Sequence, residues 1–232
     1  DIHVEIHSGE TIGIIGGTGS AKSSLVNLIS RLYDVTSGQV KVGGVDVRDY
    51  DMEVLRNQVS VVLQKNVLFS GTILENLRWG DKNATEEECM RACRLACADE
   101  FIERMPEKYE TYIEQGGSNV SGGQKQRVAA LRALLLHPQI VLADEPTGAL
   151  DSRSARSLME QLSGVNREDE AAVLMVTHDA QAASFCSRIL FIQDGKVFHE
   201  LRKRVGEETN REFYERILSV MAQLGGGSNY VL

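Results

Sequence analysis

The chain has 232 residues, of which 42% are hydrophobic and 25% are charged, as expected for a globular protein with a sizeable core. A net charge of −8 argues against a nucleic-acid-binding protein, because such proteins usually present a basic face. No hydrophobic run approaches the ~18 residues that a membrane-spanning helix needs, and no secretory signal is visible, so we expect a soluble protein.

Strands and helices are predicted to alternate along most of the chain. The predicted strands lie at residues 11–15, 39–42, 60–63, 140–143, 172–177, 189–193 and 196–201. Helical patterns lie at residues 22–32, 121–137, 152–162 and 180–186. Several strands are continuous hydrophobic or β-branched runs, which is typical of sheets covered on both faces. The alternation favours an α/β fold with a mainly parallel sheet.

Residues 72–104 interrupt this alternation and are predicted to form successive helices, one of them opened by a capping box at Thr85 and Glu88. We interpret the stretch as a helical insertion. A second such box, at Thr209 and Glu212, opens an amphipathic helix that extends to about residue 224. Cys89, Cys93 and Cys97 recur every four residues, match no zinc pattern, and are expected to be small buried hydrophobes in a reducing compartment.

A glycine-rich loop follows the first strand and precedes the first helix. Strand, loop, Lys-Ser and helix is the context of a phosphate-binding P-loop, whose backbone N–H groups and helix N-terminus face a polyphosphate. Lys22 would reach the β- and γ-phosphates, and the Ser23 hydroxyl would bind Mg²⁺. Taken alone, the loop is also compatible with a glycine-rich turn beside a surface lysine. The candidate contacts are Gly16, Gly17, Thr18, Gly19, Ser20, Ala21, Lys22, Ser23 and Ser24.

Two acidic residues end the strand predicted at 140–143. The carboxyl ends of strands in an α/β sheet are where ligands bind. Asp144 would hold Mg²⁺ directly or through water, and Glu145 would orient and polarise an attacking water as general base. A strand followed by an acidic turn is the alternative, which the upstream P-loop disfavours.

A second candidate phosphate site reads V-S-G-G-Q at residues 120–124. Ser121 and Gln124 form a capping box, and Gly122 and Gly123 let an anion approach the first N–H groups of the helix. Two such sites far apart in one chain suggest a nucleotide held between two subunits.

These motifs together resemble the nucleotide-binding domain of an ATP-binding cassette (ABC) transporter. Residues 120–124 are similar to the family signature L-S-G-G-Q, with valine in place of leucine. Gln64 resembles the Q-loop glutamine, Asp151 ends a segment similar to the D-loop, and His178 resembles the switch histidine. Alone, these three residues would be read as a strand-end polar residue, a helix N-cap and a surface histidine. The likeness runs from about residue 7 to residue 195, in the family's order.

The resemblance implies a P-loop NTPase fold with a mainly parallel RecA-like sheet and an inserted α-helical subdomain. Residues 1–64 and 125–232 would form the α/β core and residues 65–124 the helical signature subdomain of a single domain. The implied cofactors are ATP and Mg²⁺. Glu145, His178 and Gln64 would be catalytic, and Ser23, Gln64 and Asp144 would bind the metal.

The implied mechanism is head-to-tail dimerisation, with each ATP between one P-loop and the signature residues of the other subunit. Ser121, Gly122, Gly123, Gln124 and Asp151 would therefore contact nucleotide across the interface. The partners would be a second nucleotide-binding domain, in a homo- or heterodimer, and a transmembrane subunit or domain that places the chain at the inner, cytoplasmic face of the membrane. No nucleic-acid partner is expected, and the exported substrate would be a peptide, drug or lipid-like molecule.

The sequence departs from the family pattern in three ways. Ala21 stands where the P-loop pattern has glycine. No aromatic residue precedes Gly16 to stack on adenine, so we expect the first antiparallel strands to be missing or truncated, and Tyr230 cannot be assigned to that role. Finally, residues 64–73 and 114–117 resemble multidrug or peptide exporters, whereas residues 143–151 and 177–179 resemble bacitracin-resistance cassettes, as a natural recombinant or an engineered hybrid would.

Two alternative functions follow. ABC ATPases of DNA repair or translation carry coiled-coil arms or tandem cassettes, and this chain has neither. A hybrid cassette that binds nucleotide without productive hydrolysis or transport coupling is favoured by Ala21 and the missing aromatic, and disfavoured by the intact Glu145 and His178.

Overall fold

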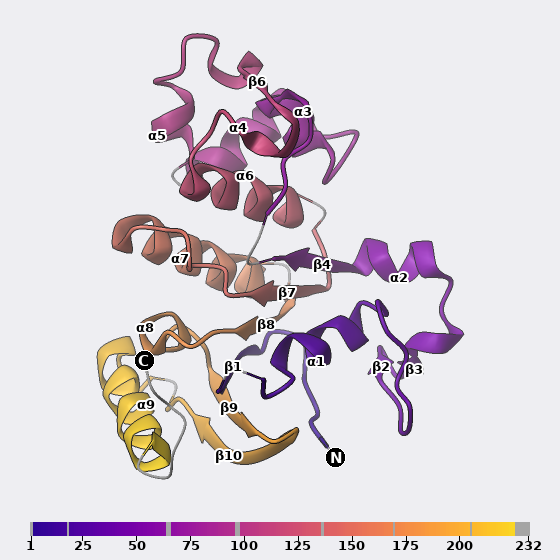
Figure 1. Ribbon diagram of the computed structural model, residues 1–232, viewed down its shortest axis with the longest axis vertical. Coiled ribbons are helices and arrows are strands. Elements are labelled where there is room, and N and C mark those ends of the chain that lie inside the picture. The colour runs from indigo at the N-terminus through magenta and orange to yellow at the C-terminus, as the bar shows by residue number, and fades with distance from the viewer. Residues whose placement is uncertain are drawn as a thin grey trace.

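The computed structural model describes residues 2–17, 19–63, 66–95, 98–135, 137–168, 170–204 and 206–225. A six-stranded sheet in the order β10-β9-β1-β8-β7-β4 lies at its centre (Figure 1). All neighbouring strands are parallel except β10, which pairs antiparallel with β9. This arrangement confirms the predicted α/β fold with a mainly parallel sheet. The strands are β1 (Thr11–Gly16), β4 (Val59–Val62), β7 (Ile140–Asp144), β8 (Ala172–Val176), β9 (Arg188–Gln193) and β10 (Lys196–Arg202).

Both faces of this sheet are buried along β9, β1, β8, β7 and β4, which explains the continuous hydrophobic runs of these strands, whereas the edge strand β10 is mostly exposed. On one face, Ile15, Val173 and Met175 pack with residues of α7 (Ser152–Glu168), α8 (Ala180–Ala183) and α9 (Asn210–Gly225). On the other face, Ile12 and Leu174 pack with residues of α1 (Lys22–Ile29) and α2 (Met52–Gln58). Successive residues of β1 and β8 therefore enter opposite clusters, as strand pleating requires.

The predicted helical insertion forms the upper part of the molecule in Figure 1. It contains α3 (Ile73–Arg78), α4 (Glu86–Leu95) and α5 (Asp99–Ile102), with the short helices η2 (Lys108–Glu110) and η3 (Gln115–Gly117). The strands β5 (Gly71–Thr72) and β6 (Tyr112–Ile113) form a separate two-stranded sheet. The capping box at Thr85 is confirmed, because its hydroxyl accepts from the Glu88 amide while the Glu88 carboxylate accepts from the Thr85 amide.

Cys89 and Cys93 are fully buried in the hydrophobic cluster of this helical part, as predicted. Burial raises the pKa of the Cys93 thiol to about 12, so the group stays a protonated, unreactive thiol near neutral pH. Cys97 lies outside the described residues.

Helix α6 (Gly122–Leu134) belongs to both parts of the molecule. Ala130 and Ala133 pack into the cluster that the sheet forms with α7, α8 and α9. Val128 and Leu131 pack into the cluster of the helical part. The subdomain boundary predicted after residue 124 falls within the first turn of this helix. The helix is therefore a rigid connection between the two parts, and the division into subdomains stays a prediction.

Several elements differ from their predicted bounds. The strand predicted at residues 39–42 reduces to β2 (Lys41–Val42), which pairs with β3 (Val45–Asp46) in a hairpin outside the main sheet; the short helix η1 (Val47–Asp49) follows. Helix α1 ends at Ile29 rather than at 32, because Arg31 adopts a left-handed conformation with φ 51°.

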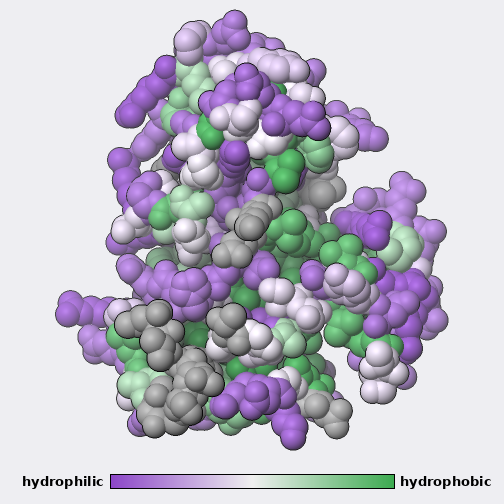
Figure 2. Space-filling view, in the orientation of Figure 1, coloured by the Kyte–Doolittle hydropathy of each residue, from purple (hydrophilic) through white to green (hydrophobic). Residues whose placement is uncertain are grey.

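The last helix confirms the second capping box, since the Thr209 hydroxyl accepts from the Glu212 amide and the Glu212 carboxylate accepts from the Thr209 amide. Among the described residues, no helix has the length and hydrophobicity needed to cross a membrane. The face shown in Figure 2 is mostly hydrophilic over the helical part, and hydrophobic side chains gather nearer its middle.

Candidate nucleotide-binding site

Three neighbouring strands of the sheet, β1, β8 and β7, end beside one another, and predicted site residues follow each of them. In the register of the sheet, Val176 of β8 lies between Ile14 of β1 and Asp144 of β7. Because these strands are parallel, the segments that follow them emerge at the same edge, where α/β proteins bind ligands. That edge carries the P-loop after β1, Glu145 after β7 and His178 after β8.

The P-loop is held tightly against the sheet. A Cβ atom on Gly16 would lie 2.3 Å from the Ile192 carbonyl oxygen and 2.7 Å from the Ser20 Oγ, so only glycine fits there. Gly19 has φ 81°, a conformation that glycine adopts without strain. Thr18 lies outside the described residues.

Lys22 folds back over this loop. Its Nζ donates to the carbonyl oxygens of Gly16 and Gly17 at 2.7 and 2.9 Å, and to the Ser20 Oγ at 3.2 Å. Burial lowers the pKa of Lys22, and the negative charges of Glu145 and Asp144 oppose that shift. The ammonium group thus lies at the mouth of the loop, where it can exchange these carbonyl partners for phosphate oxygens.

Ser23 and Asp144 are brought together from positions far apart in the sequence. The Ser23 Oγ donates to the Asp144 Oδ2 at 3.0 Å. A hydroxyl and a carboxylate supply the hard oxygen ligands that Mg²⁺ prefers. Among the described residues, no group of three or more His, Cys, Asp or Glu side chains is placed to hold a metal. These donors fit an ion such as Mg²⁺, which usually takes few protein ligands and completes its shell with phosphates and water.

Glu145 and His178 form a pair at this edge. The Glu145 Oε1 lies 2.8 Å from the His178 Nδ1, and the Thr177 hydroxyl lies 3.5 Å from the Glu145 Oε2. The Glu145 side chain is only 13% exposed, whereas that of His178 is 76% exposed. Glu145 also has φ 50°, an uncommon conformation for a residue with a side chain, and its amide donates to the Val176 carbonyl at 2.9 Å. Strained backbone of this kind clusters at functional sites.

The V-S-G-G-Q segment forms the predicted helix N-terminus. The Ser121 Oγ accepts from the Gln124 amide at 3.3 Å and the Gln124 Oε1 accepts from the Ser121 amide at 2.8 Å, which confirms the capping box. A Cβ atom on Gly123 would lie 3.1 Å from the Ala149 carbonyl oxygen, and one on Gly122 would lie 3.9 Å from the Ala149 Cβ. The segment therefore packs against the residues that precede Asp151.

Asp151 caps helix α7. Its carboxylate accepts from the amides of Arg153 and Ser154 and from the Ser154 hydroxyl. Backbone hydrogen bonding from Ser154 holds the pKa of Asp151 below its usual value. The alternative assignment of Asp151 as a helix cap is thus correct, and its contact with nucleotide stays a prediction.

The structure therefore gathers the P-loop, Asp144, Glu145 and His178 at one edge. Within the described part of the chain, no hydrogen bond joins residues 121–124 to the P-loop. Gln64 lies outside the described residues. Two residues near the site were not predicted from the sequence: Thr177, whose hydroxyl faces Glu145, and Gln126, a polar residue 2% exposed on the inner side of α6. A polar residue at a core-facing helical position was the available indication for Gln126.

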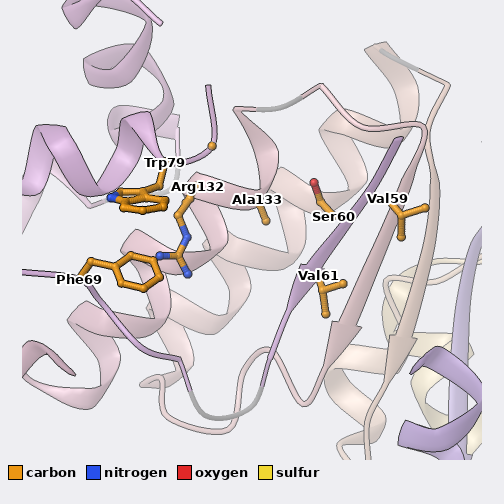
Figure 3. A pocket seen from close by; sticks show the side chains of 8 residues that line it. Val59, Ser60, Val61, Phe69, Trp79, Arg132 and Ala133 are labelled. Atoms are coloured by element: carbon orange, nitrogen blue, oxygen red, sulfur yellow. The ribbon is translucent and has the colours of Figure 1, made fainter. Parts of the chain in front are cut away.

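A pocket of about 290 Å³ lies elsewhere, between β4 and the helical part (Figure 3). The rings of Phe69 and Trp79 lie 4.6 Å apart at their centroids, and the Arg132 guanidinium lies 5.2 Å from the centroid of Phe69. None of the residues predicted to bind nucleotide lines this pocket. The candidate nucleotide site is instead an open edge of the sheet.

We predict that Ala21→Gly stabilises the fold. Ala21 has φ 65°, a conformation that costs a residue with a side chain roughly 1–2 kcal/mol. Glycine would remove this strain, but it loses more backbone entropy on folding than alanine does, which costs roughly 0.5–1 kcal/mol. The free energy of unfolding, measured with urea, should therefore rise by up to about 1 kcal/mol.

The matched control is Ala92→Gly, the same change inside helix α4, which should lower stability by about 1 kcal/mol. Loss of stability in both variants would contradict a strained P-loop.

Comparison with known proteins agrees with this geometry. The ABC transporter family model matches residues 1–148. Two relatives are named as multidrug export ATP-binding/permease proteins, one from Bacillus subtilis strain 168 and one from Staphylococcus aureus strain NCTC 8325. They are 40% and 39% identical to this chain over 197 residues. That alignment covers 85% of this chain but 34% of each relative, so the chain spans about a third of their length.

A solved structure of a bacterial Atm1-family ABC exporter with ATP bound is also similar. It has a TM-score of 0.80 and 28% sequence identity, over 90% of this chain and 37% of that one. The similarity therefore extends over most of this chain, in sequence and in fold. The chain belongs to the ABC transporter family and corresponds to the ATP-binding domain of that family.

Proposed function

We propose that this chain hydrolyses ATP and thereby powers export through a membrane partner. The observation that carries the proposal is the Glu145–His178 pair, 2.8 Å apart, on the edge that also holds Lys22, Ser23 and Asp144. A half-buried carboxylate beside a phosphate-binding loop is an arrangement suited to water activation.

Binding of ATP would use the P-loop amides, the N-terminus of α1 and the Lys22 ammonium, which favour the negative charge of the phosphates. Ser23, Asp144 and, as predicted, Gln64 would hold Mg²⁺. Bound there, Mg²⁺ would neutralise charge that develops on the phosphates during transfer.

Hydrolysis would depend on Glu145. Its carboxylate can accept a proton from a water aimed at the γ-phosphate, and His178 can hold the carboxylate in place through the Nδ1 contact. The exposed His178 ring can also reach a γ-phosphate oxygen with its other nitrogen. Since both groups are present, hydrolysis is favoured over the alternative of a cassette that only binds nucleotide.

We predict that Glu145→Gln keeps ATP binding and loses turnover. The amide fills the same space but cannot accept the proton from water, so the rate should fall by about 10²–10⁴. Steady-state phosphate release and calorimetric ATP binding measure the two quantities separately. Glu170→Gln, at an exposed position away from this edge, is the control and should hydrolyse at the parental rate. A Glu145→Gln variant as active as its parent would refute the assignment of the base.

The same geometry supports a head-to-tail dimer. The Ser121 helix N-terminus can bind an anion, yet within the described residues it shares no hydrogen bond with the P-loop of its own chain. We propose that Ser121, Gly122, Gly123 and Gln124 bind the γ-phosphate held by a second nucleotide-binding domain, and that Asp151 lies in the same interface. ATP would then close the dimer and hydrolysis would release it.

Dimerisation can be tested in the Glu145→Gln background, where ATP persists. We predict that Ser121→Arg abolishes the ATP-induced dimer in size-exclusion chromatography, because a bulky cation would occupy a tight interface. Ser219→Arg, an exposed position on α9, should dimerise like its background. Equal dimerisation of the Ser121→Arg variant would exclude the shared site.

The remaining features of the proposal come from the relatives. They are named as export proteins with both ATP-binding and permease parts, and this chain aligns with about a third of the length of each. We therefore propose a transmembrane partner, attachment at the cytoplasmic face of the membrane, and a peptide, drug or lipid-like substrate. The similarity of residues 143–151 and 177–179 to bacitracin-resistance cassettes stays a hypothesis of mixed ancestry.

A further inference from the structure

A buried amide on helix α6 joins three segments of the proposed nucleotide site. Gln126 lies in the second turn of α6 and is 2% exposed. Its Nε2 donates to the Pro146 carbonyl at 2.8 Å and lies 3.5 Å from the Leu63 carbonyl oxygen. Its Oε1 accepts from the Asn66 Nδ2 at 2.5 Å. The amide thus uses its donors and its acceptor on partners outside its own helix.

The bond to Pro146 bears directly on Glu145. Proline has no N–H, so its carbonyl is the only backbone group of that residue that can form a hydrogen bond. On the other side, the Glu145 amide donates to the Val176 carbonyl of β8. Glu145 itself has φ 50°, and such strain persists only where the surroundings over-determine the backbone. The sheet and Gln126 thus support this backbone on either side of Glu145, together with the Gly148 amide, which donates to the Glu145 carbonyl at 3.2 Å.

The other two bonds reach the flanks of residues 64–65. Leu63 precedes the predicted Q-loop glutamine Gln64, and Asn66 follows shortly after it. The Asn66 Nδ2 also donates to the Leu63 carbonyl at 2.6 Å, so the two flanks and Gln126 form one connected network. A displacement of α6 therefore changes hydrogen bonds on both sides of Gln64 and on the residue after Glu145.

We propose that Gln126 is a positioning residue for hydrolysis. It fixes the Glu145 backbone relative to helix α6 and to Leu63 and Asn66, which flank Gln64. This inference rests on the proposed function. Because Ser121 caps the helix that carries Gln126, engagement of Ser121 by the γ-phosphate of a partner subunit would be transmitted to the base through the Gln126 amide. Gln126 does not touch the reacting atoms.

The test is Gln126→Met, which keeps the length of the side chain and removes its hydrogen bonds. The matched control is Asn76→Leu. Asn76 is 1% exposed, and its amide makes three hydrogen bonds to the backbone of Phe69 and Thr72, all within the helical part. Both variants lose a buried amide network, but only Gln126→Met loses contacts to the proposed site.

Gln126→Met should lower kcat by about ten- to hundredfold while KM and the calorimetric affinity for ATP change by less than about twofold. Asn76→Leu should leave kcat unchanged even where it lowers the thermal unfolding midpoint. A parental kcat in a folded Gln126→Met variant would overturn the proposal, and so would an equal loss of kcat in both variants.

Hydrogen–deuterium exchange separates this inference from the proposed function. The Gly148 amide donates to the Glu145 carbonyl, so exchange in residues 145–150 reports on the backbone around Glu145. Gln126→Met should accelerate exchange there and Asn76→Leu should not, whether or not the parent hydrolyses ATP. An inactive parent with faster exchange in Gln126→Met would refute the proposed function alone. Unchanged exchange would refute the role of Gln126.

Should Gln126→Met fail to fold, Asn66→Ala provides the same test with a milder change, since Asn66 is only partly buried. It removes the bond to the Gln126 Oε1 and should change kcat and exchange in the same direction to a smaller extent. A folded Asn66→Ala variant with parental kcat and parental exchange would contradict the network.

Discussion

The adjacency of three parallel strands, β1, β8 and β7, is the constraint on which the rest of the structure depends. Parallel pairing fixes the direction of each strand, so the loops after Gly16, Asp144 and Val176 must emerge at one edge. No local interaction between the P-loop and Glu145 is needed to bring them together. Burial of both faces of the sheet beneath helices then makes this adjacency a property of the hydrophobic core rather than of the site.

The core allows polar and strained features at that edge. Lys22 donates to two carbonyl oxygens of its own loop, and Ala21 and Glu145 both have positive φ. Each of these features is costly in isolation, and each is held by elements that the core places rigidly. In the proposed function, these features would organise the site for phosphate and Mg²⁺ in advance, which would lower the cost of ordering it on binding.

Helix α6 adds a mechanical property to this arrangement. It packs into the hydrophobic clusters of both parts of the molecule and is capped by Ser121, the residue that we propose faces a partner subunit. A rigid helix shared by two packed parts transmits displacement more effectively than a loop. The Gln126 amide gives that displacement a defined route to the backbone around Glu145.

Features with local physical causes were predictable from the sequence. The hydrophobic runs of β1, β7 and β8 and the capping boxes at Ser121 and Thr85 each depend on neighbouring residues, and all of them are confirmed. The separate β2–β3 hairpin was not predictable, because the strand pattern does not reveal which partner a strand will have. Nor were the backbone strain at Ala21 and the Gln126 network, which arise from tertiary packing between distant segments.

Early termination of α1 has a similar origin. The hydrophobic pattern continues through Leu32, but Arg31 turns left-handed and its guanidinium donates to the carbonyls of Val47 and Arg48. Those acceptors belong to a different segment, so the pattern within the helix carries no information about them. Leu32 is left 53% exposed as a result.

The central claim is that the loops after β1, β7 and β8 form one site for Mg²⁺ and ATP. Calorimetric titration of MgATP into the Lys22→Ala variant tests it most directly, with the exposed Lys196→Ala variant as control. Charge-assisted hydrogen bonds of this kind contribute about 1.5–3 kcal/mol each, so the affinity of Lys22→Ala should fall about tenfold or more. Affinity equal to that of the parent and of Lys196→Ala would contradict the account.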